Sequence, residues 1–220
     1  TDDLRQSHEY QTAISEVLAA ISRSTVDLAP VLQTLTETAL RLCEAEMGFI
    51  VRREGEHFIV VTAAGTTPEI ARDAEDYRRH QAAIPIVVDR GSVTGRVALA
   101  GGPVQIPDIA ADPEYRLAGA TALGKIRTQV GVPLLREGAL AGVLILSRQR
   151  VEPFSERQVG LLRTFADQAV IAMENARLLA EQREALEQQT AAAQVLEVIN
   201  ASPGNLAPVF EVVLEKAMQL

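Results

Sequence analysis

One heptapeptide of the sequence has the spacing of a phosphate-binding loop. Residues 119–125 read Gly-Ala-Thr-Ala-Leu-Gly-Lys, which matches the two glycines and the lysine that cradle nucleotide phosphates. Ile126 follows the lysine, however, at the position where the motif needs a hydroxyl that binds Mg²⁺. No hydrophobic strand precedes the heptapeptide either. We therefore expect a flexible loop of glycine and alanine here, and no nucleotide site.

The sequence holds too few thiol and imidazole groups for a redox or metal centre. Cys43 is the only cysteine, whereas disulfide exchange needs an attacking and a resolving thiol. It follows the apolar face of a predicted helix, so we expect a buried, structural side chain. The histidines, His8, His57 and His80, are scattered. His80 as a haem ligand remains an alternative, although the sequence offers no second ligand for the iron. Because no nucleophile stands with a base, we expect no enzymatic activity.

A third group of polar residues could bind a small molecule. Ser92 precedes a predicted helix at residues 93–100, and the free N–H groups at a helix start suit a carboxylate or phosphate. Arg127 offers a bidentate guanidinium, and Asp108 can accept from hydroxyl or amide donors. Each has a plainer alternative, because Ser92 and Asp108 can cap turns and Arg127 can pair with a surface carboxylate. The candidate ligand contacts are Ser92, Thr94, Gly95, Arg96, Asp108, Tyr115, Arg127, Thr128 and Gln129.

Short strands and helices alternate around these candidate residues. Two hairpins are predicted from apolar runs on either side of a Glu-Gly pair. The first hairpin pairs residues 49–51 with residues 58–61 and turns at Glu54-Gly55. The second pairs residues 129–135 with residues 140–146 and turns at Glu137-Gly138. Two shorter strands, 84–88 and 103–106, bracket the helix at 93–100, and apolar residues at helical spacing predict two helices before the first hairpin. This order predicts an α+β fold in which helices cover an antiparallel sheet.

Composition excludes several classes of partner. The chain has 220 residues and a formal net charge of −8, which repels phosphate backbones. Three tyrosines, five phenylalanines and no tryptophan leave few platforms on which bases could stack. We expect no nucleic-acid partner. No apolar run approaches the roughly 20 residues that a membrane-spanning helix needs, and no leader peptide opens the chain, so we expect a cytoplasmic protein.

The two ends of the chain resemble each other. Residues 11–42 align without gaps to residues 189–220, with 14 identities in 32 positions. Both copies contain Leu-Ala-Pro-Val, at residues 28–31 and 206–209. The chance similarity of two amphipathic helices is the alternative. The offset matches a whole domain with its connector, so we expect one complete domain followed by the first helices of a second.

A long helix is predicted between these two parts. Residues 155–200 contain no proline, and Ser155 with Gln158 can form a capping box at the helix start. At about 1.5 Å per residue this helix would be roughly 70 Å long. An apolar heptad seam predicts a homodimer formed by two such helices. The seam consists of Phe165, Ala169, Ala172, Ala176, Leu179 and Leu186. A break near residues 184–189 is the alternative.

Several spaced motifs resemble the GAF domain family over about residues 12–180. The first group is Ser92-Val93-Thr94-Gly95-Arg96-Val97, residues 102–109 and Asp112-Pro113-Glu114-Tyr115. The second is a closing hairpin with Val132-Pro133-Leu134, Gly138 and Gly142-Val143-Leu144. The last helix adds Phe154, Gln158, Phe165-Ala166 and Asn175-Ala176-Arg177-Leu178. The resemblance implies a six-stranded antiparallel sheet with the terminal helices on one face and a small-molecule pocket on the other.

The resemblance also implies parallel dimers in bacterial multidomain signalling proteins, upstream of a kinase, a cyclase or another output domain. Cys43 does not lie where the pocket would be, so we expect no covalent bilin of the kind that phytochrome-like relatives carry. The cofactor is left unknown. The expected domains are a sensor core at 1–154, a connector helix at 155–188 and a second, partial GAF-like domain at 189–220.

We therefore expect a regulatory module that senses a small molecule of unknown identity and relays its state through a dimeric helix. The alternative is a ligand-free module for dimerisation and spacing. In that case a side chain such as Leu117 or Leu123 would fill the pocket.

Overall fold

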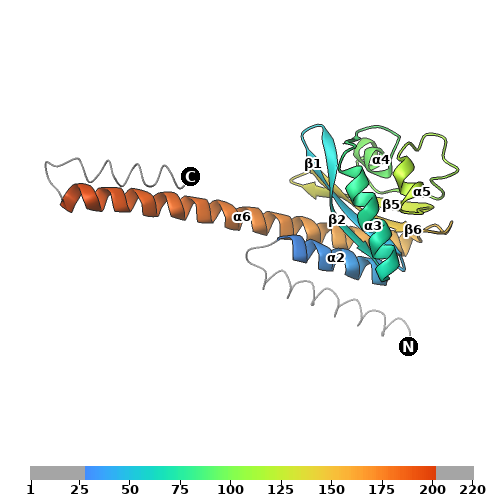
Figure 1. The fold of residues 1–220 in the computed structure, drawn as a ribbon, viewed down its shortest axis with the longest axis horizontal. Helices are drawn as coiled ribbons and strands as arrows, with labels where there is room; N and C mark the ends of the chain where they lie inside the picture. Colours follow the sequence, from blue (N-terminus) through green and yellow to red (C-terminus); the bar gives the residue numbers. More distant parts are fainter. Residues whose placement is uncertain (1–27, 202–220) are drawn as a thin grey trace, which may run out of the picture. The chain divides into compact units, whose positions relative to one another are not determined.

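The computed structural model describes residues 28–201, apart from the side chains at 192 and 194–201 (Figure 1). Eleven helices and strands lie in this range. They are α2 (Leu28–Leu42), β1 (Met47–Glu54), β2 (His57–Gly65), α3 (Pro68–Gln81), β3 (Ile86–Val87), α4 (Val93–Ala100), β4 (Val104–Ile106), α5 (Ala118–Ala122), β5 (Thr128–Arg136), β6 (Ala139–Arg148) and α6 (Glu156–Ala201). The first predicted helix and residues 202–220 of the predicted second domain lie outside the described residues.

The six strands form one antiparallel sheet in the order β3-β2-β1-β6-β5-β4. Both predicted hairpins are confirmed, as β1–β2 and β5–β6. At the second turn Glu137 and Gly138 have φ angles of 51° and 81°. Two consecutive positive φ angles are typical of the tight turn that matches strand twist, and glycine adopts them without strain.

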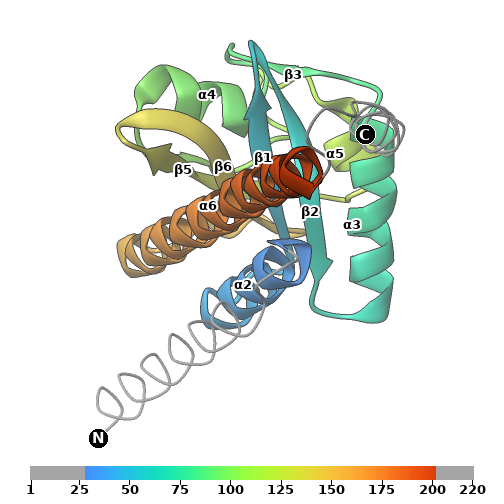
Figure 2. The ribbon, with the colours of Figure 1, turned by 90° about the vertical axis from the view of Figure 1, so that its left-hand side faces the viewer.

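Helices cover both faces of the sheet, as predicted. On one face α2 and the first part of α6 enclose an apolar core with Leu35, Leu144 and Leu162. On the other face α3, α4 and α5 enclose a second core, which contains Phe49, Tyr77 and Ile145. On this face α3 packs against β2 and α4 packs against β5, so the two helices lie towards opposite edges of the sheet (Figure 2). The α+β fold class is confirmed.

A buried arginine connects α2 to the segment before α6. Arg148 is only 1% exposed, at the end of β6. Its guanidinium donates to the carbonyl oxygens of Cys43 and Glu44, each at 3.2 Å, and of Glu152 at 2.9 Å. It also lies 4.3 Å from the centre of the Phe154 ring. The Pro153 carbonyl also accepts from this guanidinium, at 3.4 Å. Because four backbone carbonyls from two segments share one cation, this side chain fixes where α2 ends and α6 begins.

The long helix is continuous. The Ser155 N–H donates to Gln158 Oε1 at 3.0 Å, and the Gln158 N–H donates to Ser155 Oγ at 3.3 Å, so the predicted capping box is confirmed. No break occurs at 184–189, and the domain boundary that we predict after residue 188 falls inside α6. Residues up to Glu174 belong to one compact unit and residues from Asn175 to another.

Three residues of the predicted dimer seam lie in the core of their own chain. Phe165, Ala169 and Ala172 are buried in the core between α6 and the sheet of their own chain. An apolar stripe that already packs within the chain is not available to a partner helix. Of the predicted seam, Ala176 and Leu179 are half-buried and Leu186 is exposed.

The flexible loop predicted at residues 119–125 is also corrected. Its first part forms helix α5, and Lys125 Nζ donates to Asp73 Oδ2 of α3 at 2.8 Å. This segment is therefore attached to α3 by an ion pair.

Candidate ligand cavity

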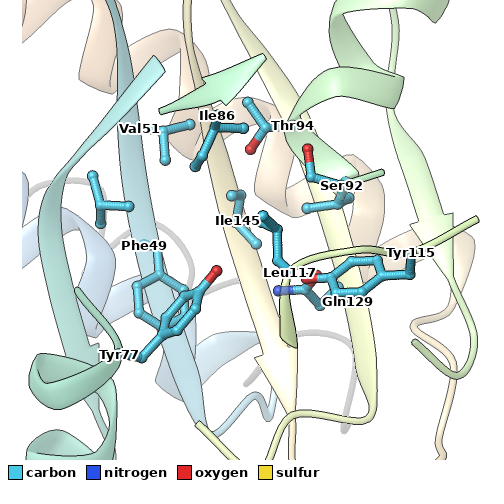
Figure 3. A pocket seen from close by; sticks show the side chains of 12 residues that line it. Phe49, Val51, Tyr77, Ile86, Ser92, Thr94, Tyr115, Leu117, Gln129 and Ile145 are labelled. Atoms are coloured by element: carbon cyan, nitrogen blue, oxygen red, sulfur yellow. The ribbon is translucent and has the colours of Figure 1, made fainter. Parts of the chain in front are cut away.

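A small cavity lies within the second core, between the sheet and the helices α3 and α4 (Figure 3). Its volume is about 10 Å³, which is room for one water molecule. Most of its lining is apolar, and includes Phe49, Val51, Ile86, Leu117 and Ile145. Five polar side chains complete it: Tyr77, Ser92, Thr94, Tyr115 and Gln129. The cavity thus combines an apolar wall with a few hydroxyl and amide groups, as small-molecule sites do.

Tyr77 of α3 carries a hydroxyl group that points into this cavity (Figure 3). The side chain is 5% exposed, and its ring meets Phe49 edge-on with 5.4 Å between the ring centres. Within residues 28–201, no hydrogen-bond partner reaches the Tyr77 hydroxyl. Burial raises the pKa of this phenol, so it stays neutral. This hydroxyl can donate a hydrogen bond to a molecule in the cavity and accept one from it.

Thr94 presents a second hydroxyl from the first turn of α4. The residue is almost fully buried and its oxygen faces the same space as the Tyr77 hydroxyl (Figure 3). It likewise has no hydrogen-bond partner in the described part of the chain. Neighbouring Ser92 is the predicted cap of α4, since its Oγ accepts from the Gly95 N–H at 3.0 Å. The Tyr77 and Thr94 hydroxyls, which can each donate and accept a hydrogen bond, therefore face the cavity from different walls.

Tyr115 and Gln129 form a closed polar pair at another wall. The Tyr115 hydroxyl donates to Gln129 Oε1 at 2.9 Å, and Gln129 Nε2 donates to Ser147 Oγ at 3.2 Å. This chain of bonds fixes both side chains. Unlike the Tyr77 hydroxyl, the pair needs no ligand to satisfy it.

Five of the predicted ligand contacts do not line the cavity. Arg96 binds Asp112 through two hydrogen bonds of 2.6 and 2.8 Å, and Arg127 binds Asp108 through two of 2.9 and 2.7 Å. Thr128 Oγ1 donates to the Pro107 carbonyl at 2.6 Å. The fifth residue, Gly95, packs against the backbone of the segment before α4. The polar groups among these five residues therefore pair within the chain and do not face the cavity.

The segment 112–117 closes the cavity and is held by three ion pairs. They are Arg96–Asp112, Arg90–Glu114 and Arg116–Asp89. The first is the most buried, and the Arg96 guanidinium lowers the pKa of Asp112 to about 2. Tyr115 and Leu117 of this segment line the cavity on the side across from Tyr77 (Figure 3). The size of the cavity therefore depends on where this segment lies.

Sequence reasoning missed Tyr77, which stands in the charged run Glu-Asp-Tyr-Arg-Arg. The available signal was its spacing of three from Ala74, which places both residues on one face of α3. Both are buried in the second core. Of the two leucines proposed as plugs, Leu117 lines the cavity and Leu123 is exposed.

His80, the alternative haem ligand, is exposed beside Gly119 and does not line the cavity. Cys43 is completely buried in the core on the opposite face of the sheet, where burial raises the pKa of its thiol to about 12. Within the described residues, no cluster of three metal-ligating side chains occurs. Nor does any helix there have the length and apolarity to cross a membrane.

Comparisons with known proteins agree with this architecture. A family model described as GAF domain matches residues 25–174. The GAF domain of a phosphoenolpyruvate-protein phosphotransferase from Coxiella burnetii is similar in structure, with a TM-score of 0.63 and 14% identity, covering 79% of this chain and 98% of that one. Free methionine-R-sulfoxide reductase from Neisseria meningitidis has a TM-score of 0.59 and 19% identity, with 77% and 90% covered.

Residues 122 to 287 of a methyl-accepting chemotaxis protein give a TM-score of 0.58 and 23% identity, with 74% of this chain and 98% of that chain covered. No curated protein matches the chain in sequence. The likeness to the solved structures concerns the fold, whereas the family model covers well over half of the chain. The chain therefore belongs to the GAF domain family.

Proposed function

We propose that the chain is a regulatory module that senses a small, uncharged molecule in the cavity beside Tyr77. The observation that carries this proposal is the pair of hydroxyls on the buried residues Tyr77 and Thr94, which face the cavity and have no hydrogen-bond partner in the described part of the chain. Membership of the GAF family and the similar fold of a chemotaxis protein support a role in signalling.

The lining supports an uncharged ligand. Among the described residues, every side chain that lines the cavity is uncharged. Arg96 and Arg127 lie elsewhere, where carboxylates pair with them. A charged molecule would lose its hydration without gaining a counter-ion, which is costly in an apolar site. A small molecule with an apolar body and one or two carbonyl or hydroxyl groups fits this lining. It would enter by displacing Leu117 or moving the 112–117 segment.

In this proposal the ligand state reaches an output domain through α6, which pairs with α6 of a second copy. The sheet offers a direct route within the first unit. Ile145 lines the cavity, whereas its neighbours Leu144 and Leu146 lie in the core beneath α2 and α6. Consecutive strand residues point to opposite faces, so a shift of β6 at the cavity also reaches the helices.

The proposal includes no catalysis by this chain. The similar methionine sulfoxide reductase shares the fold, but here the only thiol, Cys43, is remote from the cavity. With a pKa of about 12 the thiol stays protonated, whereas a reactive cysteine must be a thiolate. We further propose a cytoplasmic location without a nucleic-acid partner, in line with the net charge of −8.

A second candidate function is ligand-free dimerisation and spacing. The volume of about 10 Å³ favours it, because no metabolite fits beside Leu117 without a rearrangement. The two candidate functions differ in one respect, because only a sensor needs the cavity to enlarge so that a ligand can enter.

A melting-temperature screen separates the two functions. Uncharged metabolites are added to the wild-type chain and to Leu117→Ala, which enlarges the cavity without touching the two hydroxyls. A ligand at about 100 times its Kd adds about 2.7 kcal/mol, which raises the melting temperature of such a domain by about 5 to 10 °C. If no uncharged compound shifts either protein, the sensing function is wrong and the spacer function stands.

A further inference from the structure

An open cleft lies beside α2, where the end of β2 leads into α3. Its volume is about 590 Å³, which is within the range of small-molecule sites. It differs from the Tyr77 cavity in place, because α2 packs on the opposite face of the sheet from that cavity, and the two spaces share no lining residue. The cleft is lined by Thr34, Glu37, Thr38, Leu40, Arg41, Gly65 and Thr66.

One face of α2 supplies the first wall of the cleft. Thr34, Thr38 and Arg41 follow each other at spacings of four and three residues, which places them side by side on a helix. The apolar face of the same helix, with Leu35 and Ala39, is buried in the core. The polar face of α2 is therefore held in a fixed direction by the packing of its apolar face.

Gly65 and Thr66 form the second wall, which backbone contacts hold in place. The Thr66 N–H donates to the Glu46 carbonyl at 3.1 Å, and Gly65 pairs with Met47 between β2 and β1. A Cβ atom at Gly65 would lie 2.3 Å from the Ala71 amide nitrogen, so β2 passes directly against the start of α3. This wall is formed before any ligand binds, which lowers the cost of ordering on binding.

Thr38 differs from the two nearest threonines of α2. Thr34 Oγ1 donates to the Pro30 carbonyl at 2.9 Å. Thr36 Oγ1 donates to the Leu32 carbonyl at 2.8 Å, four residues back in the same way. Thr38 is 7% exposed, and its hydroxyl has no hydrogen-bond partner in the described part of the chain. This hydroxyl can donate a hydrogen bond to a molecule in the cleft and accept one from it.

Glu37 and Arg41 bring opposite charges to the cleft. Both residues are exposed, and within residues 28–201 neither forms an ion pair. Glu37 Oε1 accepts a hydrogen bond from the Gln33 side-chain amide at 2.8 Å. Residues four apart on a helix have Cβ atoms about 5–6 Å apart, so one small molecule can contact both charged groups.

We propose that this cleft binds a small zwitterion, with the ammonium and carboxylate groups of a free amino acid. Arg41 holds the carboxylate through two N–H groups, and Glu37 accepts from the ammonium group. The Thr38 hydroxyl, three positions before Arg41, donates to the same carboxylate. A ligand with a single charge would be repelled by one of the two charged residues, whereas a zwitterion is attracted by both. The site goes beyond the proposed function, which concerns an uncharged molecule in the Tyr77 cavity.

Nuclear magnetic resonance of the isotope-labelled, full 220-residue chain tests the site. The standard L-amino acids are titrated one at a time. We expect at least one of them to shift the backbone amide signals of α2, Gly65 and Thr66, and to leave those around Thr94 unchanged. The N-acetyl form of that amino acid is an anion only, and its methyl ester is a cation only. Each should bind at least about tenfold more weakly, because it loses one charge-assisted contact.

Substitutions assign the two charges. Arg41→Gln and Glu37→Gln should each weaken binding of the amino acid at least about tenfold by isothermal titration. Because both residues are exposed, these variants should melt close to the wild-type temperature. Thr38→Val should weaken binding about five- to tenfold. The matched control is Arg53→Gln, which removes an exposed arginine near the turn of the β1–β2 hairpin and should bind like the wild type.

The outcomes separate this inference from the proposed function. It is wrong if no standard amino acid shifts the α2 signals, or if the singly charged forms bind as tightly as the zwitterion. Shifts around Thr94 in place of α2 would also overturn it, since the amino acid would then occupy the Tyr77 cavity. Thr94→Val, which should weaken a ligand of that cavity, should leave binding at the cleft unchanged. A melting-temperature screen without any hit would end the proposed function and leave this site intact.

Discussion

At the scale of single residues, Arg148 shows how a charged group can serve a structural role. Its cation replaces the missing donors at the end of α2, where helix carbonyls have no partner within the helix. The aromatic ring of Phe154 covers it from one side. Sequence reasoning missed this residue, because an arginine at the end of a strand is normally expected to be solvated.

Replacing this cation should be costly. We expect Arg148→Met to keep much of the buried volume but leave several carbonyl oxygens unsatisfied, which lowers the free energy of unfolding by about 3 kcal/mol. Urea denaturation measures the change. The matched control is Arg150→Met, which removes an arginine that forms surface ion pairs only and should cost less than about 1 kcal/mol. Equal losses in the two variants would contradict the role assigned to Arg148.

The ion pair between Arg96 and Asp112 predicts a pH dependence. Asp112 has a lowered pKa of about 2, mainly because it accepts two hydrogen bonds from the guanidinium. A carboxyl group whose pKa is lower in the folded state adds stability above its unfolded pKa, and that stability disappears as pH falls through the folded value. The wild type should therefore exceed Asp112→Asn in stability at pH 6, with the difference shrinking from about pH 4 towards pH 2. Denaturant midpoints measured across this range check it, and a constant difference would argue against the ion pair.

At the scale of elements, the position of α4 depends on a glycine. A Cβ atom at Gly95 would lie 2.2 Å from the Asp89 carbonyl oxygen, so this turn of the helix sits directly on backbone. Because backbone cannot easily yield, α4 has one way to pack, and that packing aims Thr94 at the cavity.

We expect Gly95→Ala to lower the free energy of unfolding by about 1 to 3 kcal/mol, as overpacking does. Gly160→Ala is the control, because nothing lies within 4 Å of its Cβ position and it stands inside α6. That variant should gain about 0.5 to 1 kcal/mol from helix propensity. Thermal denaturation compares the two, and a neutral Gly95→Ala would mean that α4 can shift.

The elements that were predictable carry local signals. The β5–β6 hairpin follows from Glu137-Gly138, and the start of α6 from the reciprocal bonds of Ser155 and Gln158. What covers the apolar stripe of α6 was not predictable, because periodicity shows that a stripe is apolar but not what buries it. Phe165 packs within its own chain. Likewise, Arg127 is an equally good ligand contact or surface ion pair until Asp108 is placed beside it.

At the scale of the whole molecule, the sheet separates two helical layers and contacts both of them. One face holds the cavity and the other holds α2 with the start of α6. The family and the antiparallel sheet could be predicted from spaced motifs. The cavity lining could not, since it depends on which side chains meet after folding. Tyr77 of α3 and Thr94 of α4 are brought together by tertiary packing alone.

The central claim is that an uncharged ligand binds between these two hydroxyls. Isothermal titration of the ligand found in the screen tests it most directly, in the wild type, Thr94→Val and Tyr77→Phe. Loss of one hydrogen bond to the ligand should weaken its binding about five- to tenfold in each variant. Thr34→Val, on α2 at the other face, should bind like the wild type. Unchanged affinity in both cavity variants would contradict the claim.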